Sequence, residues 1–275
     1  MATVVILIEP YDVAIWKLHL MSVLVPRWVD AKHRCILHAG PDKLPAADLA
    51  FLHVDLSVVP QEYLDAMKRY PIAVNGSIAD IRKRAHSVNL VARGDPYAGR
   101  VIVKSDLNSG GKPEVGKRNM ARSLGKLNGP MEDPAESQYR VYDSPAEVPA
   151  AVWDDPALVV EKFLPEQEGD TYLLRYYYFL GDAEANLVLR SREPIVKAVN
   201  TYRVDFEPPP PEIRALRRKL GFGYGKFDYV LRDGRVVLFD ANRTPSHSLL
   251  LRQRLVEPVV NRLAPGLESL LQPAA

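Results

Sequence analysis

The chain has 275 residues, of which 47% are hydrophobic and 25% charged, which is an ordinary globular composition. Its 36 Lys and Arg exceed its 34 Asp and Glu by only two, so the basic excess of a dedicated nucleic-acid-binding protein is absent and no nucleic acid partner is expected. Cys35 is the only cysteine, which excludes an intrachain disulfide.

The N-terminal run of residues 1–10 is apolar but short, and it lacks the basic start of a signal peptide. It therefore reads as a strand. No apolar run approaches the roughly 18 to 20 residues that a membrane span requires. We expect a cytoplasmic protein with no membrane partner.

Strand and helix signals alternate over the first part of the chain. Short buried strands are predicted at residues 3–8, 35–38, 50–54 and 72–74, and helical spacing of apolar residues occurs at 13–25 and 61–70. This alternation indicates an α/β layer with a largely parallel sheet. We predict a small Rossmann-like lobe over residues 1–74.

The middle of the chain starts with a predicted helix over residues 77–90, for which Asn75, Gly76 and Ser77 are candidate caps. A strand at 100–104, a loop of small and polar residues at 105–113 and a strand at 158–163 follow. Residues 129–149 are rich in proline and charge.

Two hairpins are predicted in the last third, and each has a turn that contains Gly and Asp. The first joins strands 171–180 and 185–191, and the second joins strands 227–231 and 236–239 through Asp233-Gly234. A helix at 212–220 lies between them. Residues 249–271 read as an amphipathic helix broken near Pro258 and Pro265.

The second hairpin carries the strongest chemical signal. An antiparallel pair can place Asp228 beside Asp240, and Asn242 shares a strand face with Asp240 because side chains alternate along a strand. Three oxygen ligands on one patch suit Mg²⁺, whose octahedron ATP phosphates could complete. The alternative is a pair of aspartates that cap the Asp-Gly turn.

Two further segments are compatible with nucleotide binding. Lys104 ends a buried strand before Gly110 and Gly111, so its ammonium and the backbone N–H groups could meet one phosphate. A lysine that is merely exposed is the alternative. The run 159–164 has a charged pair between apolar residues, which fits a hinge that reads adenine or, equally, a plain edge strand.

In this order the segments resemble the ATP-grasp superfamily over roughly residues 75–248. The most specific part is the pair of runs 225–228 and 240–245, although Asp240 stands where that superfamily usually has Glu. The resemblance implies an α/β fold in which the lobe at 1–74 precedes an ATP-grasp domain of two α+β subdomains at 75–275. The central ATP-binding subdomain is expected at about 75–164 and the C-terminal subdomain with the metal site at about 165–275.

The resemblance also implies ATP and Mg²⁺ as cofactors, with roles for individual residues. Phosphate contacts are expected from Lys104 and from Lys83, for which Arg84 is an alternative, and the flap at 105–112 contains Gly110. Adenine-hinge residues are Glu161, Lys162, Phe163 and Leu164. The ribose-binding acid is Asp170 or Glu168, and Arg190 or Arg175 meets the γ-phosphate.

The implied reaction joins a carboxylate to an amine through an acyl phosphate. Lys226 is expected to stabilise the tetrahedral intermediate, and Arg243 to grip the substrate carboxylate. The substrates would be small molecules or peptides, and a homodimer is compatible with the resemblance. The alternatives are a kinase of the same fold that phosphorylates a hydroxyl, and a nucleotide-binding module without catalysis.

The glycine-rich run 221–225 resembles a dinucleotide fingerprint, but it follows a predicted helix and opens a predicted strand. The fingerprint requires the reverse order. A close-packed turn that delivers Lys226 and Asp228 is the better interpretation.

Overall fold

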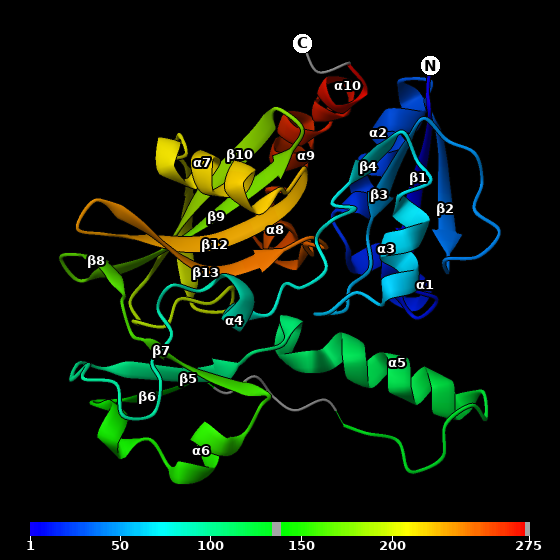
Figure 1. Ribbon diagram of the computed structural model, residues 1–275. Coiled ribbons are helices and arrows are strands. Elements are labelled where there is room, and N and C mark those ends of the chain that lie inside the picture. The colour runs from blue at the N-terminus through cyan, green and yellow to red at the C-terminus, as the bar shows by residue number, and fades with distance from the viewer. Residues whose placement is uncertain (134–138, 273–275) are drawn as a thin grey trace.

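The computed structural model describes residues 1–133 and 139–272, and it contains helices and three separate sheets in a mixed α/β arrangement (Figure 1). This confirms the predicted fold class. Figure 1 shows the N-terminal sheet beside the C-terminal sheet, with the small central sheet beneath.

The N-terminal sheet has four parallel strands in the order β2-β1-β3-β4. Side chains of β1 alternate between two cores, with Val4 and Ile6 facing α2 and Val5 and Leu7 facing α3, because successive residues point to opposite faces. The predicted strands and the helix at 61–70 are confirmed to within a few residues. The elements are β1 (Thr3–Ile8), α1 (Asp12–Ile15), the 3-10 turn η1 (Trp16–Leu18), α2 (Met21–Asp30), β2 (Arg34–Ala39), β3 (Leu49–Leu52), α3 (Gln61–Met67) and β4 (Ile72–Val74).

The helix expected over residues 77–90 is wrong, because only α4 (Lys83–His86) is helical there. Several backbone groups at the start of this segment bond to other parts of the chain. The Ala79 carbonyl accepts from Val59 N at 2.8 Å, and Ile81 N donates to the Ser57 carbonyl at 2.9 Å. These tertiary bonds satisfy the backbone polar groups and override the local helical preference.

The central sheet has three antiparallel strands in the order β6-β5-β7. The predicted loop after β5 is a short 3-10 turn followed by a helix, so the expectation of loop throughout 105–113 is corrected at its end. Ser109, Gly110 and Gly111 have φ of 48°, 70° and 80°. Two of these three consecutive left-handed residues are glycines, which adopt this conformation without steric strain. The elements are β5 (Val101–Ser105), η2 (Asn108–Gly111), α5 (Lys112–Ser123), β6 (Arg140–Tyr142), η3 (Pro145–Glu147), α6 (Ala150–Asp154) and β7 (Leu158–Lys162). The stretch at 129–149 lies partly outside the described residues.

The C-terminal sheet has the order β11-β10-β9-β12-β13, and β8 pairs with β9. Both predicted hairpins are confirmed. In the second, Asp233 and Gly234 have φ of 51° and 75°, the left-handed pair that a tight two-residue hairpin turn requires. The elements are β8 (Glu166–Glu168), β9 (Thr171–Leu180), β10 (Ala183–Ser191), β11 (Thr201–Phe206), α7 (Pro211–Leu220), β12 (Tyr224–Arg232) and β13 (Arg235–Asn242).

Three short helices close the described chain: α8 (Ser248–Arg252), α9 (Val256–Leu263) and α10 (Gly266–Leu271). The breaks predicted near Pro258 and Pro265 are both present, the first between Arg252 and Val256 and the second between Leu263 and Gly266. Pro258 lies in the first turn of α9, where its missing N–H leaves no hydrogen bond unmade. The first break occurs before it, where Arg254 has a φ of 54°.

One hydrophobic core joins the N-terminal sheet to the C-terminal sheet. Ile6 and Phe51 belong to the same cluster as Leu180, Leu187 and Leu263. The central sheet has a smaller cluster of its own, built on Val101, Val103 and Val160. None of the helices in the described ranges is long and apolar enough to cross a membrane.

Candidate functional site

The β12–β13 hairpin brings the predicted metal ligands together. Asp228 pairs directly with Asp240, and Lys226 pairs with Asn242. This register confirms that the two carboxylates lie side by side. An irregularity after Asp228 shifts the pairing, which separates this patch from the regular ladder toward the turn.

Each carboxylate of the patch has a lysine partner. Lys226 Nζ lies 2.8 Å from Asp228 Oδ1 and 3.9 Å from the centroid of the Tyr176 ring. Lys83 Nζ, from α4, lies 3.4 Å from Asp240 Oδ1. A residue far away in sequence therefore supplies the second cation.

Burial and neighbouring charge oppose each other at these groups. Burial raises the pKa of Asp228 to about 6, against the lowering effect of Lys226. Burial also raises the pKa of Asp240, but Lys83, His86 and other cations outweigh it and hold that pKa below its ordinary value. Desolvation is the largest single influence on the pKa of Lys83 and lowers it, but Asp240, Tyr139 and Glu161 together outweigh it and raise that pKa. Asp240 and Lys83 are therefore both ionised near neutral pH.

The central sheet contributes a second ion pair. Lys104 on β5 pairs with Glu161 on the neighbouring strand β7, and both side chains are almost completely buried. The Lys104 ammonium also lies 5.1 Å from the centroid of the Phe239 ring, which belongs to β13 of the other sheet. Lys104 thus stands at the junction of the two sheets.

A cavity of about 450 Å³ opens between the central and C-terminal sheets. One part of its wall is polar and carries the ammonium groups of Lys83, Lys104 and Lys226. The other part is apolar and is formed by Ile102, Phe163, Leu164, Leu173, Val230 and Phe239. A flat apolar base and a charged phosphate chain would each find a matching wall.

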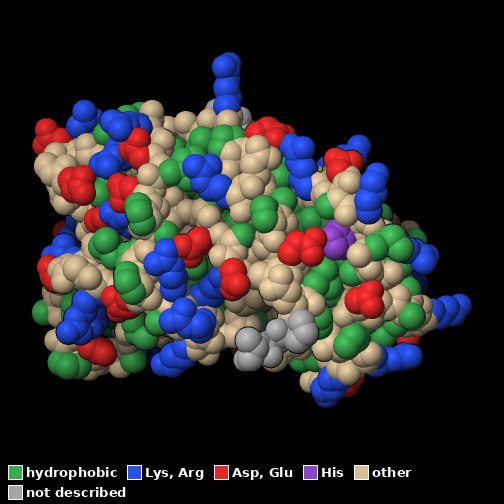
Figure 2. Space-filling model, turned by 90° about the horizontal axis from the view of Figure 1, so that it is seen from above, with side chains coloured by type: hydrophobic (Ala, Val, Ile, Leu, Met, Phe, Trp, Pro, Cys, Tyr) green, Lys and Arg blue, Asp and Glu red, His purple; other side chains and the backbone are tan. Residues whose placement is uncertain are grey.

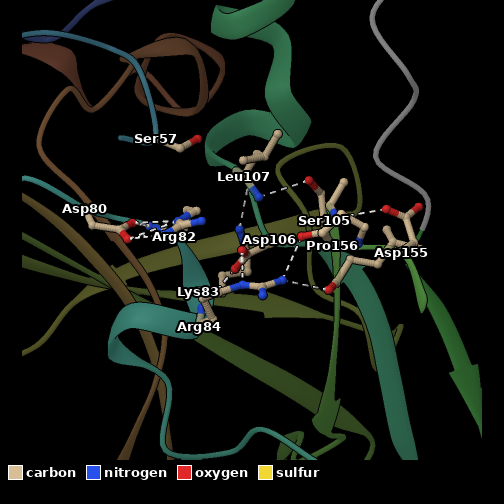
Figure 3. Close-up of polar contacts among 12 residues, drawn as sticks. Ser57, Asp80, Arg82, Lys83, Arg84, Ser105, Asp106, Leu107, Asp155 and Pro156 are labelled. Atoms are coloured by element: carbon tan, nitrogen blue, oxygen red, sulfur yellow. Dashed lines mark hydrogen bonds and ion pairs between the residues drawn. The ribbon is translucent and has the colours of Figure 1, made fainter. Parts of the chain in front are cut away.

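Figure 3 shows how α4 is fixed beside this cavity. Asp106, fully buried after β5, accepts from the Arg84 backbone N–H at 2.9 Å and from its guanidinium. The Asp106 carbonyl accepts from Lys83 N at 3.1 Å. Arg84 is thereby directed to Asp106 and the Pro156 carbonyl, while Lys83 lines the cavity.

The cavity gathers most of the residues that the sequence singled out. The members of this set that line it are Lys83, Lys104, Gly110, Lys162, Phe163, Leu164, Lys226, Asp228, Asp240 and Asn242. Glu161 lies behind Lys104 as its ion-pair partner, and Gly111 follows Gly110 in the same turn.

The expected ribose and γ-phosphate contacts are not at the cavity wall. Arg190 pairs with Glu168 and Asp205, each at 3.0 Å. Arg175 pairs with Glu166 at 2.7 Å. Asp170 is exposed in the turn between β8 and β9, and neither it nor these arginines line the cavity.

The expectation that Arg243 grips a substrate is corrected. Its side chain is completely buried, and its guanidinium donates to the backbone carbonyls of Val54, Ile78 and Leu56. Burial lowers its pKa to about 10, and Asp55 is the largest opposing influence. Arg243 therefore joins the N-terminal lobe to the end of β13.

Several cavity residues carried no readable signal in the sequence. Tyr139 and Lys197 line the wall, and the Lys197 ammonium lies 5.0 Å from the centroid of the Tyr139 ring. Tyr176 lies beneath Lys226, and Asn108 contacts Asn242. The hydrophobic period of β9 could have placed Tyr176 on one face of its strand, but the loop residues have no such pattern.

The donor set fits a hard divalent cation. Two carboxylates and one amide meet on adjacent strands, and Mg²⁺ is typically held by one or two carboxylates together with phosphate oxygens. No three His, Cys, Asp or Glu side chains within residues 1–133 and 139–272 cluster as a metal site.

Charges of both signs are interspersed on the surface. On the face in Figure 2, the described Lys and Arg side chains alternate with Asp and Glu, without a continuous basic field. This mixed surface agrees with the near-neutral net charge.

Comparison with solved structures identifies the fold. The chain is similar to a RimK-domain ATP-grasp protein from Sphaerobacter thermophilus, with 14% identity, a TM-score of 0.51 and coverage of 96% of this chain and 98% of that one. It is also similar to D-alanine–D-alanine ligase from Bacillus anthracis in complex with ATP, with 11% identity, a TM-score of 0.52 and coverage of 98% and 96%. No family model and no curated protein sequence matches. The chain has the ATP-grasp fold, as the sequence predicted.

Proposed function

We propose that this protein is an ATP-dependent ligase that joins a carboxylate to an amine through an acyl phosphate. One observation carries the proposal: three lysines and two carboxylates, from segments far apart in the chain, converge beside an apolar slot in a single cavity. The likeness in fold to an ATP-bound ligase supports the same reaction class.

The residues of the cavity divide the work by chemistry. Ile102, Phe163 and Phe239 would enclose the base, and Lys83 and Lys104 would neutralise phosphate oxygens. Asp228, Asp240 and Asn242 would hold Mg²⁺, which supplies further neutralisation of the phosphate charge when bound.

The reaction has two balanced steps. A substrate carboxylate oxygen attacks the γ-phosphorus, and ADP leaves with the electrons of the broken P–O bond. The amine nitrogen then attacks the acyl carbon, loses a proton, and expels inorganic phosphate. Lys226, held charged beside Asp228, lies where it could stabilise negative charge on the tetrahedral intermediate.

Lys197 is our candidate for contact with an anionic substrate group in place of Arg243. Lys83, Lys104 and Lys226 each have a carboxylate partner. Lys197 faces the cavity beside an aromatic ring, and no carboxylate partners it within the described part of the chain. Its charge is therefore available to a ligand.

The test is ADP release from Mg-ATP over a panel of carboxylate and amine pairs, with hydroxylamine added to trap an acyl phosphate. Wild type should release ADP only with a matching pair, and Asp240→Ala combined with Asn242→Ala should abolish release. Lys219→Met, an exposed change on α7, is the charge-loss control and should keep the activity. Full turnover by the double variant would refute the metal assignment. A stable phosphorylated hydroxyl product would show a kinase instead.

A further inference from the structure

A buried polar network links the N-terminal lobe to the cavity. Asp55 follows β3, and its Oδ1 accepts from Asn108 Nδ2 at 2.9 Å and from the Thr244 hydroxyl. Asn108 belongs to the turn that covers the cavity, and Thr244 follows β13. One carboxylate thus contacts two elements of the candidate site.

The nitrogen and the oxygen of the Asn242 amide bond to Asn108 and Thr244, the two residues that the Asp55 carboxyl contacts. Asn242 Nδ2 donates to Asn108 Oδ1 at 3.4 Å, and Asn242 Oδ1 accepts from Thr244 N at 2.7 Å. Because the Asn108 amide donates its own N–H to Asp55, it presents its oxygen to Asn242. The orientation of the Asn242 amide therefore follows from Asp55 through Asn108.

The direction in which the Thr244 hydroxyl donates its proton determines whether Asn242 Oδ1 has a lone pair available for a ligand. That hydroxyl lies within hydrogen-bonding distance of both Asp55 Oδ1 and Asn242 Oδ1, the latter at 3.1 Å, but it has one proton. The contact with Asp55 is the closer of the two, so the proton goes to Asp55. The Asn242 oxygen then accepts only the Thr244 N–H and keeps one lone pair for a cation.

The backbone of Asp55 and the neighbouring Ser57 also hold the covering turn in place. Asn108 Nδ2 also donates to the Asp55 carbonyl at 3.1 Å, and Asn108 N donates to Ser57 Oγ at 2.8 Å. Glu114 of α5 accepts from Ser57 N at 2.7 Å. Figure 1 shows α5 extending beneath the N-terminal lobe, where these bonds attach it.

We infer that Asp55 is a positioning residue for the metal-binding amide of Asn242 and for the turn at Asn108–Gly111, acting through Thr244 and Asn108. It touches no candidate ligand itself. This inference deepens the proposed function and rests on it for the metal, whereas its effect on Asn108 and Asn242 does not require any ligand.

The test compares Asp55→Asn, Thr244→Val and Thr244→Ser with wild type. Calorimetry measures ATP affinity with and without Mg²⁺, and NMR follows the side-chain amides of Asn108 and Asn242 in ligand-free protein. We expect Asp55→Asn and Thr244→Val to lose about tenfold or more of the Mg²⁺ enhancement, as when a group that orients a metal ligand is removed. ATP affinity without metal should stay unchanged, and Thr244→Ser should behave as wild type because it keeps the hydroxyl.

The control is Asp48→Asn, which changes an exposed carboxylate of the same lobe that accepts from the Thr3 N–H at 2.7 Å, away from the Asp55 network. It should leave the Mg²⁺ enhancement and both amide signals unchanged. An unchanged enhancement, or unchanged amide signals, in Asp55→Asn would overturn the inference. Failure of wild type to bind Mg-ATP would instead refute the proposed function, and the amide signals would still decide the role of Asp55.

Discussion

The N-terminal and C-terminal sheets share one core, whereas the central sheet has its own small core, and the cavity lies between these two units. Phe51 of the lobe contacts Trp28 and Tyr224, and Tyr224 belongs to the C-terminal sheet. The central sheet relies on a few valines and on the Lys104–Glu161 pair. The carboxylates of the site therefore sit on the larger unit, and Lys104 sits on the smaller one.

Because the cavity lies between a large core and a small one, one of its walls can stay rigid while the other opens. Local opening is easiest where few buried apolar contacts must be broken. We expect the central sheet to open at a lower free energy than the shared core, so hydrogen exchange should be faster in β5 and β7 than in β1, β9 and β12.

The largest expected effect comes from Phe51→Ala. Phe51 is 1% exposed, and its loss leaves a cavity between two sheets, so the free energy of unfolding should fall by about 3 to 5 kcal/mol. Denaturant titration measures the loss. Exchange should accelerate in β1 and β9 together, and acceleration in the N-terminal sheet alone would show that the core is not shared.

The Lys104–Glu161 pair should behave differently from the apolar core. Lys104→Met leaves Glu161 buried without its partner, which should cost about 3 kcal/mol. The double variant Lys104→Met/Glu161→Leu should recover most of that stability in thermal unfolding but none of the ATP affinity. Recovery of ATP binding in the double variant would show that Lys104 has only a structural role.

The free energy of unfolding should depend on pH through Asp12, a buried residue of the N-terminal lobe. Burial, and then repulsion from Asp55, raise the pKa of Asp12 to about 7 from its ordinary value of 3.8. Between these values the unfolded chain releases a proton that the folded chain keeps, so this group makes the free energy of unfolding fall as pH rises. Asp12→Asn removes that dependence.

The Tm of Asp12→Asn relative to wild type should therefore rise between pH 5 and pH 8, as followed by circular dichroism. A constant difference over that range would contradict the raised pKa of Asp12. Asp48→Asn changes an exposed acceptor of the Thr3 N–H in the same lobe and serves as the control.

The smallest effect is expected at the turn of the metal-binding hairpin. Gly234 has a φ of 75° and open space around it, so Gly234→Ala should cost about 1 kcal/mol through backbone strain alone. Thermal unfolding measures the cost. Mg-ATP affinity should be unchanged, because the ladder between β12 and β13 extends from Arg232–Arg235 to Lys226–Asn242 and pairs Asp228 with Asp240 well away from the turn.

The sequence was informative where the signal is local. Alternating hydrophobicity and the Asp233-Gly234 turn predicted the hairpin that pairs Asp228 with Asp240. The segment at 77–90 was predicted wrongly because its backbone bonds to distant segments. Arg243 was misjudged because a sequence does not reveal which way a side chain at the end of a strand points, and here three carbonyls of distant segments surround it.

The central claim is that Mg-ATP binds in the cavity beside Asp240, and isothermal titration calorimetry tests it most directly. Wild type and Lys219→Met should bind Mg-ATP with equal affinity, while the isosteric Asp240→Asn should bind at least about tenfold more weakly, because it removes a charged metal ligand. Equal affinity of Asp240→Asn and wild type, or no binding by wild type, would contradict the claim.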